Sequence, residues 1–132
     1  MLRMQWIIVV VLGVILVAVV SLKFAGSVRP ATAREYLRQG AKVIDVRSPG
    51  EFGERHLPGA VNIPLDQLTE QIGRHVPSKD DIVLLHCLSG GRSGLGTRRL
   101  RRMGYQRVYN LGSYGRAERI VREASPSLGQ PS

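Results

Sequence analysis

The sequence predicts an open, mainly parallel α/β sheet with helices on both faces, preceded by one transmembrane helix. Three observations lead to this prediction. Residues 4–22 carry no charge, strand-like and helix-like segments alternate after them, and residues 81–87 (Asp-Ile-Val-Leu-Leu-His-Cys) form the most continuous apolar run of the remainder. An uninterrupted apolar strand is buried on both faces, as in the centre of a parallel sheet. Strands that alternate with helices indicate the same architecture.

The N-terminal apolar run is close to the length that a membrane-spanning helix needs. Its nineteen uncharged residues compare with roughly 20 residues, each rising ~1.5 Å, for a hydrocarbon layer of ~30 Å. No polar face interrupts the run, which argues against a buried core helix. A cleaved signal peptide is the alternative. However, cleavage after Ala25 would put Lys23 at the −3 position, which is unfavourable, and a site after Ala33 would lie far from the apolar run. We therefore expect residues 1–25 to be a retained single-pass anchor in the membrane lipid.

The flanking charges predict the orientation of this anchor. One basic residue, Arg3, precedes the run, whereas Lys23, Arg29, Arg34 and Arg38 follow it. Because positive charge tends to stay on the cytoplasmic side, we expect the domain in the cytoplasm. A short basic start is also typical of exported proteins, so a periplasmic or exported domain is the alternative.

The chain carries a net charge of +9, which suits an anionic membrane surface or a small anionic substrate. Its densest basic cluster, at residues 98–102, has no interleaved aromatic residues and matches no nucleic-acid module, so we expect no nucleic-acid partner. The single cysteine excludes an intramolecular disulfide and a multi-cysteine metal site. We expect neither a metal nor a cofactor.

The chain divides into the anchor, a linker at 26–31, one α/β domain at 32–124 and a disordered tail at 125–132 that is rich in Ser, Pro, Gly and Gln. Thr32 with Glu35, and Ser48 with Glu51, have the spacing of capping boxes that begin helices. Hydrophobic periodicity and turn residues predict the other boundaries. We expect helices at 32–40, 65–76, 92–103 and 114–124, a helical turn from Ser48, and strands at 42–46, 60–63, 81–87 and 107–111.

The candidate catalytic residue is Cys87, at the carboxyl end of the most buried strand, where ligands of such sheets bind. A glycine-rich turn and a helix start follow it, so backbone N–H groups and the helix dipole can hold an anion there. Both features favour the thiolate and predict a pKa of Cys87 below ~8.5. The residues after the cysteine are the candidate substrate-binding ring: Leu88, Ser89, Gly90, Gly91, Arg92 and Ser93. Arg92 can offer its guanidinium to a sulfonate-like group.

A weaker candidate for substrate binding is Arg47, which lies with Asp45 at the carboxyl end of another strand. The alternative role is a buried Arg47–Asp45 pair that anchors residues 48–51. His86 adjoins the cysteine, but neighbouring strand residues point to opposite faces. We expect His86 to be a packed residue rather than a general base.

The loop Cys87-Leu88-Ser89-Gly90-Gly91-Arg92-Ser93 resembles the active-site loop of single-domain rhodaneses, Cys-x-x-Gly-x-Arg. Residues 43–52 and 56–64 resemble the upstream signature of that family, and residues 104–111 resemble its last strand. The resemblance spans about residues 32–114 and departs at Gly112-Ser113-Tyr114, where the family usually shows Gly-Gly and then Trp.

This resemblance implies a thiosulfate sulfurtransferase that works in two half-reactions. Cys87 would take the sulfane sulfur of a small anionic donor such as thiosulfate and hold it as a persulfide. A thiol acceptor or a protein sulfur carrier would then remove it. Such double displacement is covalent catalysis.

Two other functions fit parts of the pattern. Phosphatases and arsenate reductases share a related loop but place five residues between cysteine and arginine, whereas four lie between Cys87 and Arg92 here. The smaller ring suits one sulfur atom better than a phosphoryl group. The second alternative is a membrane-tethered persulfide carrier or interaction module with little turnover of free substrates.

Overall fold

The computed structural model describes residues 1–125, without the side chains of 22–25. The tail expected at 125–132 therefore lies outside the described residues except for Ser125. The helices are α1 (Leu2–Ala25), α2 (Pro30–Arg38), α3 (Pro49–Glu54), the short 3-10 helix η1 (Leu65–Gln67), α4 (Leu68–His75), α5 (Gly91–Arg102) and α6 (Tyr114–Ala124). The strands are β1 (Lys42–Asp45), β2 (Val61–Asn62), β3 (Val83–His86) and β4 (Val108–Gly112).

The four strands form one parallel sheet in the order β2-β1-β3-β4. Strand β3 lies between β1 and β4 and is buried at every position, which confirms the interpretation of its apolar run. The pairing of β3 with β4 shifts between Leu85 and His86, so that His86 lies opposite Gly112. Cys87 follows directly and leaves the sheet beside the end of β4.

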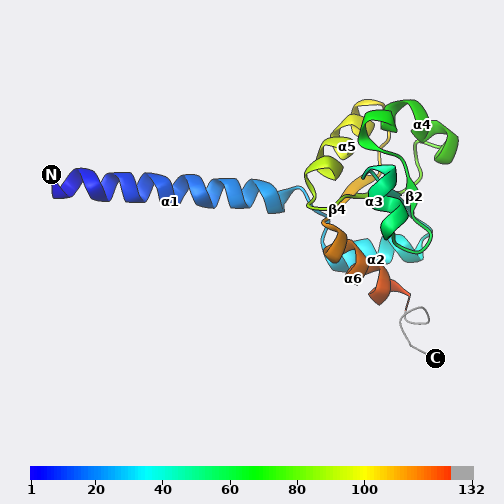
Figure 1. The fold of residues 1–132 in the computed structure, drawn as a ribbon, viewed down its shortest axis with the longest axis horizontal. Helices are drawn as coiled ribbons and strands as arrows, with labels where there is room; N and C mark the ends of the chain where they lie inside the picture. Colours follow the sequence, from blue (N-terminus) through cyan, green and yellow to red (C-terminus); the bar gives the residue numbers. More distant parts are fainter. Residues whose placement is uncertain (126–132) are drawn as a thin grey trace.

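Helices cover both faces of the sheet, as the sequence predicts (Figure 1). Helices α4 and α5 lie on one face, and α2 and α6 lie on the other (Figure 1). The first face buries a cluster that includes Ile44, Leu68, Leu85, Cys87 and Leu100. The second face buries a cluster that includes Ala33, Leu84, Leu111, Tyr114 and Ile120.

The two expected capping boxes have different outcomes. At α3 the box is confirmed, because Ser48 Oγ accepts a hydrogen bond from the Glu51 N–H (3.2 Å) and Glu51 Oε1 accepts one from the Ser48 N–H (3.1 Å). At α2 the box expected at Thr32 is wrong. That helix begins at Pro30, and Arg29 precedes it without a side-chain cap. Proline has the backbone angle of a first helical residue and so starts the helix two residues early.

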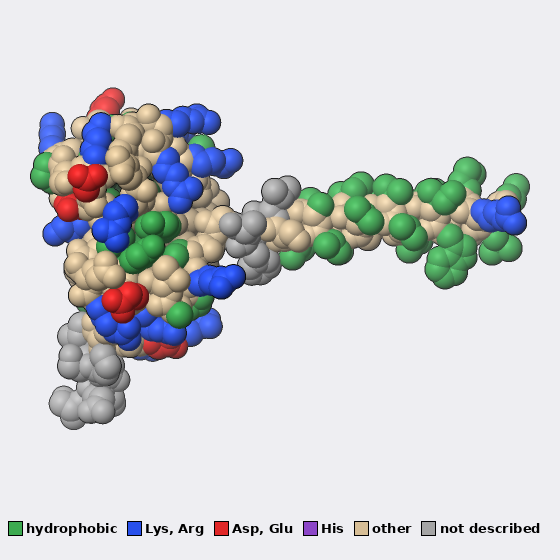
Figure 2. Space-filling model, turned by 180° about the vertical axis from the view of Figure 1, so that it is seen from behind, with side chains coloured by type: hydrophobic (Ala, Val, Ile, Leu, Met, Phe, Trp, Pro, Cys, Tyr) green, Lys and Arg blue, Asp and Glu red, His purple; other side chains and the backbone are tan. Residues whose placement is uncertain are grey.

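Helix α1 contains a segment, Leu2–Ser21, that is long and apolar enough to cross a membrane. Its side chains up to Ser21 are exposed in the isolated chain, and Figure 2 shows apolar side chains along the helix. After α1, Ser27 pairs with Asn110 and adds a single parallel bridge to the free edge of β4. The linker is therefore part of the folded sheet edge.

The close contact between α5 and the sheet depends on Gly96, and it gives a stability prediction. A Cβ atom at Gly96 would lie 2.8 Å from Leu85 Cδ2 and 3.0 Å from Leu68 Cδ2, both on buried side chains. We expect Gly96→Leu to lower the free energy of unfolding by about 2 kcal/mol, because overpacking forces these side chains apart. Thermal unfolding of the full chain in detergent micelles measures the effect.

Gly73 on α4 is the matched control, since it is exposed and a Cβ atom there would meet nothing within 4 Å. Gly73→Leu should stay within about 0.5 kcal/mol of the parent chain. Equal effects of the two substitutions would contradict the described packing of α5.

Candidate functional site

Cys87 lies buried inside a ring of hydrogen-bond donors at the carboxyl end of β3. The Gly90 N–H donates to Cys87 Sγ at 2.9 Å, and the Ser93 hydroxyl lies within hydrogen-bonding distance of the same sulfur at 3.4 Å. Both donors come from the turn and the first residues of α5. The ring that the sequence predicts therefore closes around the sulfur atom.

Two glycines allow the ring to lie against the end of β4. Gly90 precedes α5 with a φ of 97°, and Gly112 ends β4 with a φ of 93°, conformations that favour glycine. A Cβ atom at Gly90 would lie 3.4 Å from Gly112 Cα. The Tyr114 N–H also donates to the Leu88 carbonyl at 3.2 Å. The loop is thus fixed to the junction between β4 and α6.

The electrostatics of this ring favour a thiolate. Burial by itself raises the pKa of the Cys87 thiol, because a charged sulfur is less well solvated there. Hydrogen bonds from the Ser93 hydroxyl and backbone N–H outweigh burial, together with those from the Gly90 and Ser89 backbones. The net effect is a pKa of Cys87 below its ordinary value, and thiolates are the reactive form of cysteine.

Asn110 on β4 is hydrogen-bonded to two residues of the ring. Its Oδ1 accepts hydrogen bonds from the Ser93 hydroxyl (2.7 Å) and the Gly112 N–H (2.8 Å). Its Nδ2 donates to the Gly90 carbonyl at 3.2 Å. Because the Ser93 hydroxyl carries one proton, it can donate at any one time to Asn110 Oδ1, to the Gly90 carbonyl (3.2 Å) or to Cys87 Sγ. Asn110 therefore holds the Ser93 hydroxyl beside the sulfur and competes with it for the hydroxyl proton.

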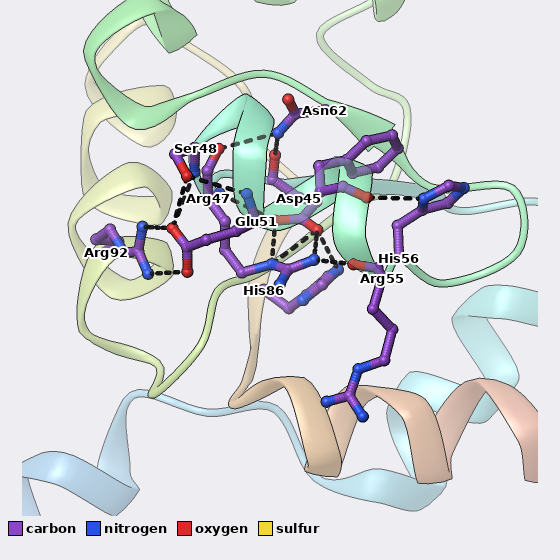
Figure 3. Close-up of polar contacts among 10 residues, drawn as sticks. Asp45, Arg47, Ser48, Glu51, Arg55, His56, Asn62, His86 and Arg92 are labelled. Atoms are coloured by element: carbon purple, nitrogen blue, oxygen red, sulfur yellow. Dashed lines mark hydrogen bonds and ion pairs between the residues drawn. The ribbon is translucent and has the colours of Figure 1, made fainter.

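Arg92 lies at the end of the ring and pairs with Glu51 of α3 (Figure 3). Its Nη1 and Nη2 donate to Glu51 Oε1 and Oε2 at 2.7 and 3.1 Å. The hydrogen bond from Arg92, followed by those from Ser48, lowers the pKa of Glu51 to about 2. The two Nη atoms of Arg92, which the sequence assigns to a sulfonate-like group, therefore bind the Glu51 carboxylate.

Arg47, the weaker candidate, lies in a buried ion pair (Figure 3). Its Nε and Nη2 donate to the Asp45 carboxylate at 3.0 and 2.7 Å, and Nη2 also donates to the Arg55 carbonyl at 2.6 Å. This geometry matches the alternative of a buried pair, and it ties Arg55, the residue after α3, to the end of β1. Substrate binding by Arg47 stays a prediction.

His86 is fully buried, and neither ring nitrogen has a hydrogen-bond partner within the described chain. Burial lowers the pKa of His86, against the opposing effect of the Asp45 carboxylate 3.8 Å away. The ring packs edge-on against Tyr114 with centroids 5.8 Å apart. His86 is therefore a neutral packing residue, as expected.

The structure brings all the predicted ring residues together and adds two that sequence reasoning missed. Leu88 and Ser89 are exposed at the rim, whereas Ser93 is buried beside the sulfur. The missed residues are Asn110 and Glu51. An asparagine inside an apolar strand was a usable signal for the first. Among residues 1–125, no group of three or more His, Cys, Asp or Glu side chains could hold a metal ion.

Comparison with known proteins places the domain in a family. The rhodanese-like domain family matches residues 29–115, from the last residue before α2 to the start of α6. Thiosulfate sulfurtransferase PspE of Escherichia coli is 44% identical over 69 residues, which cover 52% of this chain and 66% of that protein. The aligned part is thus just under two thirds of that relative's length.

Two solved structures have the same fold. A rhodanese from E. coli, solved with anions, superposes with a TM-score of 0.57 at 39% identity, covering 58% of this chain and 91% of that chain. The human single-domain sulfurtransferase TSTD1 superposes with a TM-score of 0.60 at 28% identity, covering 74% and 96%. The chain therefore belongs to the rhodanese family and carries a single sulfurtransferase-type domain, related to thiosulfate sulfurtransferases, over residues 29–115.

Proposed function

We propose that this chain is a membrane-anchored sulfurtransferase that moves a sulfane sulfur from thiosulfate or a persulfide to a thiophilic acceptor through Cys87. The observation that supports this proposal best is the donor ring around Cys87 Sγ, with the Gly90 N–H at 2.9 Å. Such a ring stabilises a sulfur anion both before and after transfer.

The first half-reaction loads the enzyme. The Cys87 thiolate attacks the outer sulfur of thiosulfate, an S–S bond forms, and the S–S bond of thiosulfate breaks. Sulfite leaves with the electron pair of that bond, and Cys87 keeps the sulfur as a persulfide. No external oxidant is needed, because the sulfane sulfur only changes its partner.

The second half-reaction unloads the enzyme. An acceptor thiolate attacks the outer sulfur of the Cys87 persulfide, the enzyme S–S bond breaks, and Cys87 leaves as a thiolate. The acceptor becomes a persulfide. The lowered pKa of Cys87 makes its thiolate a good leaving group in this step, so the same donors assist both half-reactions.

Arg92 positions the anionic donor in this proposal. Its Nη atoms are paired with Glu51, while its Nε has no protein partner among residues 1–125. The guanidinium can bind a sulfonate through its Nε–H, or through the Nη atoms if the Glu51 side chain moves away. Arg92 lies within electrostatic range of Cys87, because the charge of Cys87 adds to the larger effect of Glu51 in raising the pKa of Arg92.

Helix α1 is the anchor in this proposal, because Leu2–Ser21 is long and apolar enough to span a bilayer. The basic residues that follow it favour a cytoplasmic domain. Sulfur donors and acceptors would then be those of the cytoplasm, including a protein sulfur carrier.

Loading of Cys87 is the direct test of the chemistry. Exposure of the full chain to thiosulfate should add one sulfur atom to its intact mass, and Cys87→Ser should abolish the gain, because no other thiol is present. Steady release of sulfite with an added thiol acceptor would show an enzyme, and loading without turnover would show a persulfide carrier. Turnover of a phenyl phosphate without any sulfur loading would refute the proposal.

The pH dependence of Cys87 tests the role of Ser93. Because only the thiolate reacts, alkylation by iodoacetamide should rise with pH and level off at a lower pH than for free cysteine. Ser93→Ala removes a donor, so the curve should move to higher pH and the rate at neutral pH should fall several-fold. Ser89→Ala is the matched control, since Ser89 supports the thiolate through its backbone N–H. An unmoved curve in Ser93→Ala would show that the hydroxyl does not stabilise the thiolate.

The contribution of Arg92 can be separated from general charge on α5. Arg92→Lys keeps the charge but loses the planar fork, so kcat/KM for thiosulfate should fall about tenfold. Arg98→Lys on the exposed side of the same helix should leave kcat/KM unchanged. Equal kinetics for the two variants would exclude Arg92 from donor binding.

A further inference from the structure

The linker that follows α1 is fixed to the sheet edge within a few residues of the helix end. Ser27 forms a parallel bridge with Asn110, and the Val28 N–H donates to the Asn110 carbonyl at 2.8 Å. The Arg116 guanidinium donates to the carbonyls of Val28 and Leu111. The domain is therefore attached to α1 through β4 rather than through a long free tether.

The same part of β4 carries the cysteine ring. The Asn110 side chain donates to the Gly90 carbonyl, and Gly90 lies against Gly112. A Cβ atom at Gly112 would lie 3.3 Å from Ser27 Oγ. Asn110 of β4 therefore contacts both the linker and the Cys87 ring. Figures 1 and 3 show the start of α5 close to the chain that enters from α1.

Chain length then limits how far Ser27 lies from a membrane. Between Ser21, where the apolar segment ends, and Ala25, where α1 ends, four residues rise ~6 Å. The two further residues to Ser27 reach at most ~7 Å. Each headgroup layer is ~5–8 Å thick, so Ser27 lies within or just above the headgroups. This holds whichever side of the membrane the domain occupies.

The ring itself presents an apolar tip. Leu88 is 56% exposed, and within residues 26–125 it is the one large apolar side chain that is exposed. It directly follows Cys87, so the apolar tip and the reactive sulfur share one end of the sheet. An exposed leucine beside an anchored linker favours contact with an interface that is partly apolar.

A basic side chain lies next to the fixed linker. Arg29 is exposed there, directly after Val28, whose N–H donates to the Asn110 carbonyl. Glu51, the acidic residue at the ring, is neutralised by Arg92. Apolar and basic groups in this combination bind anionic phospholipid surfaces.

We propose that the Cys87 ring rests on the headgroup layer of an anionic bilayer, with Leu88 in the lipid interface and Arg29 against lipid phosphates. This inference rests on the anchor in the proposed function and not on the sulfur chemistry. Donors and acceptors then reach Cys87 along the membrane surface rather than from the bulk solution.

Tryptophan quenching in vesicles tests this contact, because Trp6 in α1 is the only tryptophan of the chain. The full chain with Trp6→Phe and Leu88→Trp is reconstituted into phosphatidylcholine–phosphatidylglycerol vesicles whose acyl chains are brominated near the headgroup. Leu88→Trp should be quenched several-fold more than Asp80→Trp in the same Trp6→Phe background. Asp80 is exposed in the loop before β3, at the opposite end of that strand from Cys87.

Two outcomes overturn the inference. In the first, Leu88→Trp is quenched no more than Asp80→Trp, while Trp6 of the unchanged chain is quenched. The anchor is then inserted, but the ring is held away from the lipid. An unquenched Trp6 shows that α1 is not in the bilayer, and the inference fails with the anchor. Sulfur loading of Cys87, measured by mass on vesicles that carry the unchanged chain, distinguishes either result from a failure of the proposed chemistry.

Discussion

A sulfur anion buried at the end of a strand is stable only if hydrogen-bond donors replace the water it has lost. Most of the polar structure near Cys87 meets this need. The turn at Gly90 and the start of α5 supply the donors, and the close approach of Gly112 lets the turn lie against β4. Asn110 holds Ser93 and Gly90 in place. The parallel sheet is the frame that brings β3 and β4 to this point together.

Both candidate arginines, Arg47 and Arg92, are paired with carboxylates. Glu51, with a pKa of about 2, stays ionised throughout the neutral range, so its pair with Arg92 is stable there. The stabilisation that this ion pair gives the fold is present above the ordinary carboxyl pKa and is lost as the pH falls towards 2, where Glu51 becomes protonated. The Arg47–Asp45 pair is more deeply buried and holds Arg55 at the end of α3, the helix that carries Glu51. One ion pair thus positions the partner of the other.

Local sequence was enough to predict the sheet, the helices on both faces and the cysteine ring. Cys87, Gly90, Arg92 and Ser93 are neighbours in the chain, and the burial of β3 follows from its uninterrupted apolar run. Contacts between distant segments were harder to predict. Glu51 and Arg92 are separated by 41 positions, and the capping-box spacing of Glu51 gave no indication of its second partner. The role of Asn110 depends on the pairing of β4 with β3, which motif reading does not supply.

Other differences have local causes. Pro30 starts α2 before the capping box expected at Thr32. Where the sequence departs from the usual rhodanese pattern, Ser113 caps α6 through a hydrogen bond from the Arg116 N–H, and Tyr114 fills the space between His86 and the guanidinium groups of Arg47 and Arg55. The departure therefore leaves the ring closed, because the Tyr114 N–H still holds the Leu88 carbonyl.

The central claim is that the ring holds Cys87 as an anion. Because Cys87 is the only cysteine, ¹³Cβ-labelled cysteine reports it alone, and its chemical shift can be followed during a pH titration of the full chain in detergent. We predict a titration midpoint below the ordinary thiol pKa of about 8.5. A midpoint at or above that value would mean that burial outweighs the donors, and would contradict the account.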